Sequence, residues 1–221
     1  MNAMRILRSI LTPAVRLELT ARLERDAIAG ILDDTFASYD EQRPSLPREA
    51  STGGRIVVHL AALTIGLYRA LVARDIAEEE ARKLTAGVTW RLYEKMAALP
   101  TALSRIRART SYDAVKRATD AFRRFPFSAP SYVMEDVAGG DDVVAFDVRR
   151  CPVAEYFRAQ GLGELCVESW CNLDFSLATK WGARLERSHT IAGGARDCDF
   201  RWRVEPVRKS PDGDHSAFDS E

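Results

Sequence analysis

Apolar residues in the first 125 positions recur at three- and four-residue steps, which is the spacing of one face of an α-helix. The series is already clear at Leu7, Ile10, Leu11, Val15 and Leu19, with arginines between these residues. It continues to about residue 39 and stops before Pro44 and Pro47. Proline removes a backbone donor and clashes with the preceding turn, so the pattern predicts helices followed by a loop over residues 44–54.

Further helices are predicted between this loop and residue 125. Residues 55–74 are apolar on most faces, which is typical of a helix at the centre of a bundle. The next helix begins with glutamates that oppose its dipole, and we expect it to end at Pro100. A basic helix follows over about residues 103–124, and its cations are interpreted as a solvated face rather than an anion-binding patch.

The pattern changes to that of strands after Phe125. Alternating residues over 132–137 and 143–148 predict two strands, which Gly139-Gly140 joins as a hairpin. The remaining elements are expected to be a helix from Pro152 to about Gly161, a helix over 164–181, and strands over 183–191 and 198–204.

These elements predict the α+β class. A helical portion, residues 1–125, should pack on a four-stranded antiparallel sheet with two helices in the order ββααββ, residues 126–206. The two portions are expected to form one compact unit, with a cavity between the helices and the sheet and the Cys171 helix as one wall. The polar residues 207–221 are expected to be disordered.

Composition and charge exclude several classes of partner. The 221 residues contain 32 basic and 32 acidic side chains, so no net field would attract nucleic acid or an acidic membrane. The longest apolar run, residues 56–68, is shorter than the roughly 18 residues of a membrane-spanning helix. The N-terminus resembles no export signal, so we expect a cytoplasmic protein acting on a small molecule. A homo-oligomer is compatible with the sequence.

The candidate chemistry is concentrated near the C-terminus. All four cysteines lie between Cys151 and Cys198, together with His189. In a reducing compartment such thiols indicate catalysis or a metal rather than disulfides. The alternative is that the thiols are inert core residues and the chain is a structural partner. His59, on the apolar helix, is expected to be a hydrogen-bonded core histidine.

Helical geometry predicts which of these groups meet. Cys171 and Asp174 are three residues apart and should share one helix face. Cys166 precedes Cys171 by five residues, about 500° around an α-helix, so it should point elsewhere and be a core thiol. Cys151 stands beside a helix N-terminus, which stabilises a thiolate, and Cys198 opens the last strand near a glycine turn.

The motifs resemble the L-2-amino-thiazoline-4-carboxylic acid hydrolase family. The resemblance is carried by Cys151-Pro152, Cys171-x-x-Asp174, Thr190-Ile-Ala-Gly193-Gly194 and Cys198-Asp-Phe-Arg201, with weaker likeness from about residue 20 onward. It implies a hydrolase that opens a small cyclic amidine or amide at a carbon–nitrogen bond. A substrate such as 2-amino-thiazoline-4-carboxylate would give a carbamoyl product.

A thiol mechanism assigns roles to these residues. The thiolate of Cys171 or Cys151 would attack the C=N carbon, and Asp174 or His189 would transfer protons. Backbone N–H groups of Gly193 and Gly194 would stabilise the negative charge that develops. Arg201, or alternatively Arg184 or Arg187, would bind the substrate carboxylate through paired hydrogen bonds.

Two alternatives remain open from the sequence. Zinc held by Cys151, Cys171 and Cys198 could activate water and achieve the same hydrolysis. The residues that close the motif region are also distantly similar to four-vinyl-reductase-type domains. That likeness implies a small-molecule-binding module with a cysteine-bound metal and no turnover.

Overall fold

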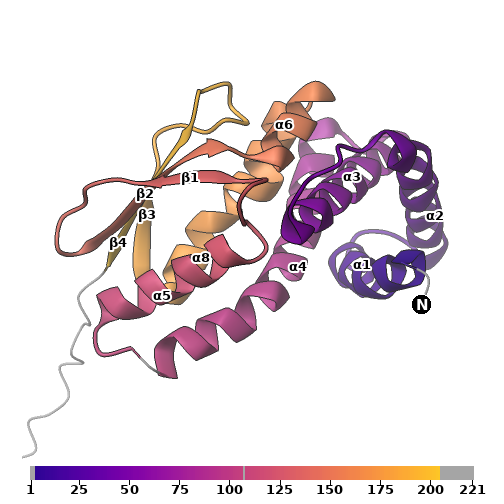
Figure 1. The fold of residues 1–221 in the computed structure, drawn as a ribbon. Helices are drawn as coiled ribbons and strands as arrows, with labels where there is room; N and C mark the ends of the chain where they lie inside the picture. The colour runs from indigo at the N-terminus through magenta and orange to yellow at the C-terminus, as the bar shows by residue number, and fades with distance from the viewer. Residues whose placement is uncertain (1–2, 107, 205–221) are drawn as a thin grey trace, which may run out of the picture.

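A computed structural model describes residues 3–106 and 108–204 of the chain, and it confirms the α+β class (Figure 1). The predicted tail, residues 207–221, lies outside the described residues. The helical portion is made of α1 (Ala3–Leu19), α2 (Arg25–Gln42), a 3₁₀ turn (Arg43–Ser45), α3 (Thr52–Val72), α4 (Glu78–Ile106) and α5 (Ser111–Arg124).

Helix α3 is the centre of the helical portion. It contacts α2, α4 and α6 (Pro152–Ala159), and most of its residues are buried. Its start is fixed by Ser51, whose hydroxyl accepts a hydrogen bond from the Gly54 amide at 2.9 Å. By length and composition α3 is apolar enough to span a membrane, but 67% of its most apolar stretch is buried within the protein. Its role as a core helix accounts for that composition.

Helix α4 passes through Pro100, so the predicted helix end at this residue is wrong. The segment around the proline is held by other elements, because α4 packs against both α5 and α8 (Leu173–Trp181). The Trp181 indole donates to the Thr101 hydroxyl at 2.9 Å, and that hydroxyl donates to the Ala97 carbonyl at 2.7 Å. The predicted basic helix is consequently divided between the end of α4 and the separate helix α5.

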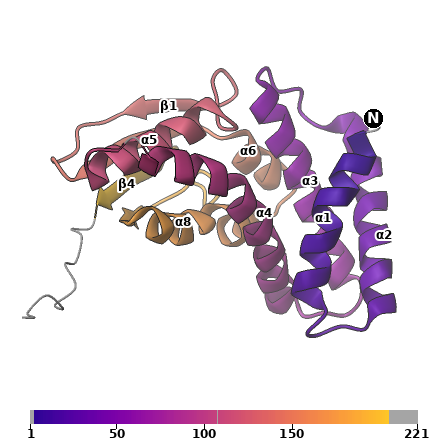
Figure 2. The ribbon, with the colours of Figure 1, turned by 90° about the horizontal axis from the view of Figure 1, so that it is seen from below.

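The C-terminal portion has the predicted order of strands and helices. It comprises β1 (Val133–Asp136), β2 (Val143–Arg150), α6, α7 (Gly163–Cys166), a π-helical turn (Val167–Cys171), α8, β3 (Ala183–Glu186) and β4 (Cys198–Val204). The strands form one antiparallel sheet in the order β1-β2-β4-β3. Helices α5 and α8 contact the sheet, and the two views show both on the same face of it (Figures 1 and 2).

Strand β3 is shorter than predicted and ends at Glu186. The Asp199 carboxylate explains this early end, because it accepts hydrogen bonds from the amides of Ser188 and His189 at 3.0–3.1 Å. A side chain that captures backbone donors in this way competes with the strand ladder. The chain then forms a loop that returns through the Gly193–Gly194 turn to β4.

The two portions share one core rather than meeting at a boundary near residue 125. Helix α5 belongs to the helical portion by sequence but packs on β2 and β4. Gly53 in α3 lies directly against the segment that enters the sheet, since a Cβ atom built on it would be 2.0 Å from the Pro126 carbonyl oxygen. This contact holds the start of α3 against the segment that leads to β1.

The Gly53→Ala substitution tests this contact. The added methyl group would collide with rigid backbone, and we expect the free energy of unfolding to fall by about 1–3 kcal/mol in chemical denaturation. Gly140→Ala is the control, because its nearest neighbour would be the flexible Asp142 side chain at 3.3 Å and its effect should stay within about 0.5 kcal/mol. Equal effects of the two substitutions would contradict the interpretation.

Candidate functional site

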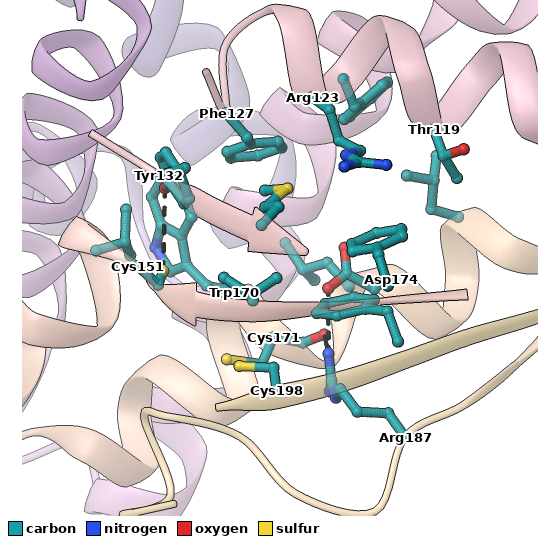
Figure 3. A pocket seen from close by; sticks show the side chains of 18 of the residues that line it. Thr119, Arg123, Phe127, Tyr132, Cys151, Trp170, Cys171, Asp174, Arg187 and Cys198 are labelled. Carbon is teal, nitrogen blue, oxygen red and sulfur yellow. Dashed lines mark hydrogen bonds and ion pairs between the residues drawn. The ribbon is translucent and has the colours of Figure 1, made fainter. Parts of the chain in front are cut away.

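A cavity of about 120 Å³ lies between the sheet and the helices that cover it, as predicted (Figure 3). Its wall is mostly aromatic and aliphatic, with few charged groups, which is usual for small-molecule sites. The residues that line it are Tyr93, Thr119, Phe122, Arg123, Phe127, Tyr132, Met134, Phe146, Val148, Cys151, Val153, Cys166, Trp170, Cys171, Leu173, Asp174, Leu177, Trp181, Arg187, Cys198, Phe200 and Trp202.

All four cysteines contribute to this wall. Two of them, Cys151 and Cys198, have a raised pKa and stay in the thiol form at neutral pH. Cys151 caps α6, where its sulfur accepts a hydrogen bond from the Ala154 amide at 3.5 Å. Cys198 accepts one from the Ile191 amide at 3.2 Å. Burial nevertheless raises the pKa of each thiol to about 12. The thiolate expected at Cys151 is therefore not supported, because burial outweighs the helix N-terminus.

Cys166 and Cys171 form a hydrogen-bonded pair, which contradicts the prediction that Cys166 points away. The prediction assumed an α-helix, but Val167–Cys171 is a π-helical turn. A hydrogen bond from the Asn172 amide to the Val167 carbonyl at 2.8 Å spans the five residues that define this geometry. Residues five apart are then stacked on the same side of the helix, and both thiols face the cavity.

Cys171 is the thiol with the lowered pKa among the four. The largest cause is the hydrogen bond from Cys166, and the Arg187 charge and a hydrogen bond from Thr190 lower it further. Burial and Asp174 act in the opposite direction. The pKa of Cys166 is raised well above its usual value, first of all by the same hydrogen bond. Cys166 thus keeps its proton and donates a hydrogen bond to the Cys171 sulfur, which favours the thiolate form of Cys171.

Asp174 is buried in the first turn of α8 and lines the same cavity as Cys171, which ends the π-helical turn, so the two residues meet although they do not share the single helix that the sequence predicted. Its two oxygens accept hydrogen bonds from the Tyr93 hydroxyl at 2.9 Å and from Arg187 Nη1 at 3.1 Å. Burial raises its pKa to about 6, although Arg187 and Tyr93 both oppose the shift. A carboxyl group with this pKa exchanges protons readily near neutral pH.

Arg187 connects the nucleophile and the acid. Its side chain is 3% exposed, and Nη1 also donates to the Cys171 carbonyl at 2.9 Å (Figure 3). The guanidinium carbon lies 5.0 Å from the ring centroid of Phe175 and 5.3 Å from that of Phe200. Arg187 is therefore a fixed part of the site.

Arg201, the predicted carboxylate-binding residue, lies on the opposite face of β4. Side chains alternate along a strand, so Phe200 and Trp202 face the cavity while Arg201 faces away. There its Nη2 pairs with Asp147 at 2.9 Å.

His189 and the glycine turn also lie outside the cavity wall. His189 is at the surface, where Nε2 contacts Asp197 at 2.5 Å and Nδ1 contacts the Ser188 hydroxyl at 2.9 Å. The Gly193 amide donates to the Thr190 hydroxyl at 3.0 Å, and the Gly194 amide donates to the Ile191 carbonyl at 3.0 Å. These amides do not face the cavity. They hold the loop that carries Thr190, whose side chain hydrogen-bonds Cys171.

Two tyrosines of the cavity wall were not among the site residues predicted from the sequence. Tyr93 comes from α4, and Tyr132 precedes β1 with its hydroxyl 4.0 Å from the Cys151 sulfur. Burial raises the pKa of both well above 10, so both remain hydrogen-bond donors. Only the fold shows that Tyr93, which is 81 residues before Asp174 in the chain, reaches its carboxylate. His59 has the hydrogen bond expected of it, to the Tyr39 hydroxyl at 2.7 Å, but it is only half-buried and lies at the edge of the core.

The three cysteines proposed as zinc ligands do not form a ligand set. Within residues 3–106 and 108–204, no three His, Cys, Asp or Glu side chains are arranged to hold a metal ion. Each thiol has a different partner: the Ala154 amide for Cys151, the Ile191 amide for Cys198, and Cys166 for Cys171.

The sequence model of the L-2-amino-thiazoline-4-carboxylic acid hydrolase family matches residues 56–202. This range covers most of the chain and includes both the α4 contribution to the site and the four cysteines. No curated protein and no solved structure matches the chain.

Alkylation by iodoacetamide tests the assignment of the thiolate. At neutral pH we expect Cys171 to react first, because thiolates are the nucleophilic form. Cys166→Ala removes the donated hydrogen bond and should move the pH dependence of this reaction to higher pH, as followed by mass spectrometry. Cys151→Ser is the control and should leave it unchanged. Faster labelling of Cys151 or Cys198 than of Cys171 would contradict the assignment.

Proposed function

Because the chain belongs to the L-2-amino-thiazoline-4-carboxylic acid hydrolase family, we propose that it opens a small cyclic amidine or amide by attack of Cys171. The family name indicates a hydrolase, and 2-amino-thiazoline-4-carboxylate is the substrate that it suggests for this chain. The observation that carries the proposal is a thiol of lowered pKa beside a buried acid in a mostly apolar cavity.

The first step forms a covalent adduct. The Cys171 sulfur bonds to the ring carbon between nitrogen and sulfur of the protonated amidine, and the C=N electron pair moves to the ring nitrogen, which keeps its proton. Cys166 and Thr190 stabilise the thiolate before the attack. The wall is mostly apolar, so these few hydrogen bonds act in a medium of low dielectric constant.

Collapse of the adduct then breaks a ring bond. We propose that the carbon–nitrogen bond breaks, with the Asp174 carboxylate taking a proton from the exocyclic nitrogen and giving it to the departing ring nitrogen. Water next adds to the carbon bonded to Cys171, with Asp174 moving its protons, and the Cys171 thiolate leaves. The sum is substrate plus one water, giving an S-carbamoyl thiol ester with a free amine.

Expulsion of the ring sulfur is the competing route from the same adduct, since a thiolate is a good leaving group. It would give an N-carbamoyl compound with a free thiol, which a thiol reagent detects. The class of reaction and the nucleophile are the same in both cases. The products therefore identify the bond without affecting the assignment of Cys171.

Turnover of 2-amino-thiazoline-4-carboxylate, followed by mass spectrometry, tests the proposed function. Cys171→Ala should lower kcat by three or more orders of magnitude, as loss of a covalent nucleophile does. Cys151→Ser should keep activity, since Ser also caps helices well. Full activity of Cys171→Ala, or activity that requires about one zinc per chain, would overturn the thiol mechanism. Tight binding without product would favour the binding module.

The pH dependence tests the role of Asp174. The pKa of Asp174 is about 6, so its carboxylate form is present above pH 6 and lost below it. If the carboxylate moves protons, kcat/KM should fall about tenfold per pH unit below pH 6 and level off above it. The rate of Cys171 alkylation, measured over the same pH range, shows the titration of the thiol by itself and so distinguishes it from that of Asp174. A profile that stays flat from pH 5 to 7 would exclude this role.

A further inference from the structure

Arg123 and Arg187 both line the cavity, but the acidic partner of Arg187 lies inside the cavity wall and that of Arg123 lies outside it. Arg187 is buried, and its counter-ion Asp174 is inside the cavity wall. Arg187 also supports the Cys171 carbonyl, so an incoming anion would have to displace internal contacts. These contacts assign Arg187 to holding the catalytic groups.

Arg123 is differently placed. It comes from α5, and its guanidinium carbon lies 5.0 Å from the Phe146 ring centroid in the cavity wall (Figure 3). Its counter-ion is Asp136 on β1, with Nη1 to Oδ1 at 2.5 Å. The Asp136 side chain is 77% exposed and is not part of the wall. Exposed ion pairs contribute little to stability, so a ligand carboxylate can take the place of Asp136 at low cost.

Trp202 provides an independent sign of a polar ligand in the same wall. The residue is 3% exposed, and its indole nitrogen has no hydrogen-bond partner in the described part of the chain. Buried indole N–H groups usually have an acceptor. An acceptor atom of a bound molecule would satisfy this donor.

We propose that Arg123 is the specificity-determining residue of the site, binding the carboxylate of the substrate in place of Asp136. Trp202 donates a further hydrogen bond to the same ligand. This inference rests on the proposed function and adds the orientation of the substrate, with its amidine carbon at Cys171 and its carboxylate at the α5 side of the cavity. Arginine suits this role, because its planar guanidinium can bind a carboxylate through two parallel hydrogen bonds.

Calorimetric binding to the Cys171→Ala protein, which cannot turn over by the proposed route, tests the inference. The probes are 2-amino-thiazoline-4-carboxylate and 2-amino-thiazoline, which lacks the carboxylate. Arg123→Met should weaken binding of the acid by roughly ten- to a hundredfold and leave binding of the analogue without a carboxylate unchanged. Arg124→Met, an exposed neighbour on the same helix, is the control and should affect neither ligand.

Two further substitutions distinguish direct recognition from a general change in the pocket. Asp136→Asn frees Arg123 and should tighten binding of the acid several-fold, but only while Arg123 is present. Trp202→Phe keeps the ring, removes the N–H group and should weaken binding about five- to tenfold. Equal weakening of both ligands by Arg123→Met, or no weakening, would overturn the inference. If the wild-type protein shows no turnover but Arg123→Met still weakens binding of the acid alone, the role of Arg123 is upheld and the proposed reaction is not.

Discussion

The π-helical turn at Val167–Cys171 is the constraint on which the rest of the site depends. One helical turn with five-residue spacing places Cys166 against Cys171, and this contact is the main cause of the lowered pKa of Cys171. The helical portion holds the turn from outside. Glu168 pairs with Arg82 at 3.2 Å, and the Trp170 indole donates to the Thr64 hydroxyl at 3.3 Å. An unfavourable local geometry is thus held by contacts from α3 and α4.

Burial acts on every ionisable group in the cavity, and the hydrogen-bond partners determine which groups stay ionised. Cys151 and Cys198 each receive one weak backbone bond, and burial prevails. Cys171 receives help from Cys166, Arg187 and Thr190 together, and the thiolate is favoured. One nucleophile is thereby selected from four chemically identical side chains, although all four line the cavity. The hydrogen bonds and the positive charge around each thiol, rather than its own chemistry, determine its pKa.

The site also explains why the helical portion and the sheet form one unit. Tyr93 reaches Asp174 from α4, Arg123 comes from α5, and Cys198 comes from β4. The C-terminal portion supplies Cys171, Asp174 and Arg187, and the helical portion supplies the Tyr93 hydroxyl bonded to Asp174 and the remaining cavity wall from α4 and α5. The match of the family model from residue 56 to residue 202 covers the segments of both portions that meet here.

The sequence by itself determined the α+β class, the order of the strands and helices, and the cavity wall that contains Cys171 and Asp174. These follow from local periodicity, because the spacing of apolar residues indicates a helix or a strand wherever the segment lies in the fold. Tertiary structure decided the partners. Cys166 pairs with Cys171 only because the helix between them is π-helical. Arg187 lies in the cavity wall and Arg201 does not, because Arg201 is on the other face of its strand. Tyr93 meets Asp174 because the fold brings together residues that are far apart in the chain. Burial and hydrogen bonding set the pKa values, and both exist only once the chain is folded.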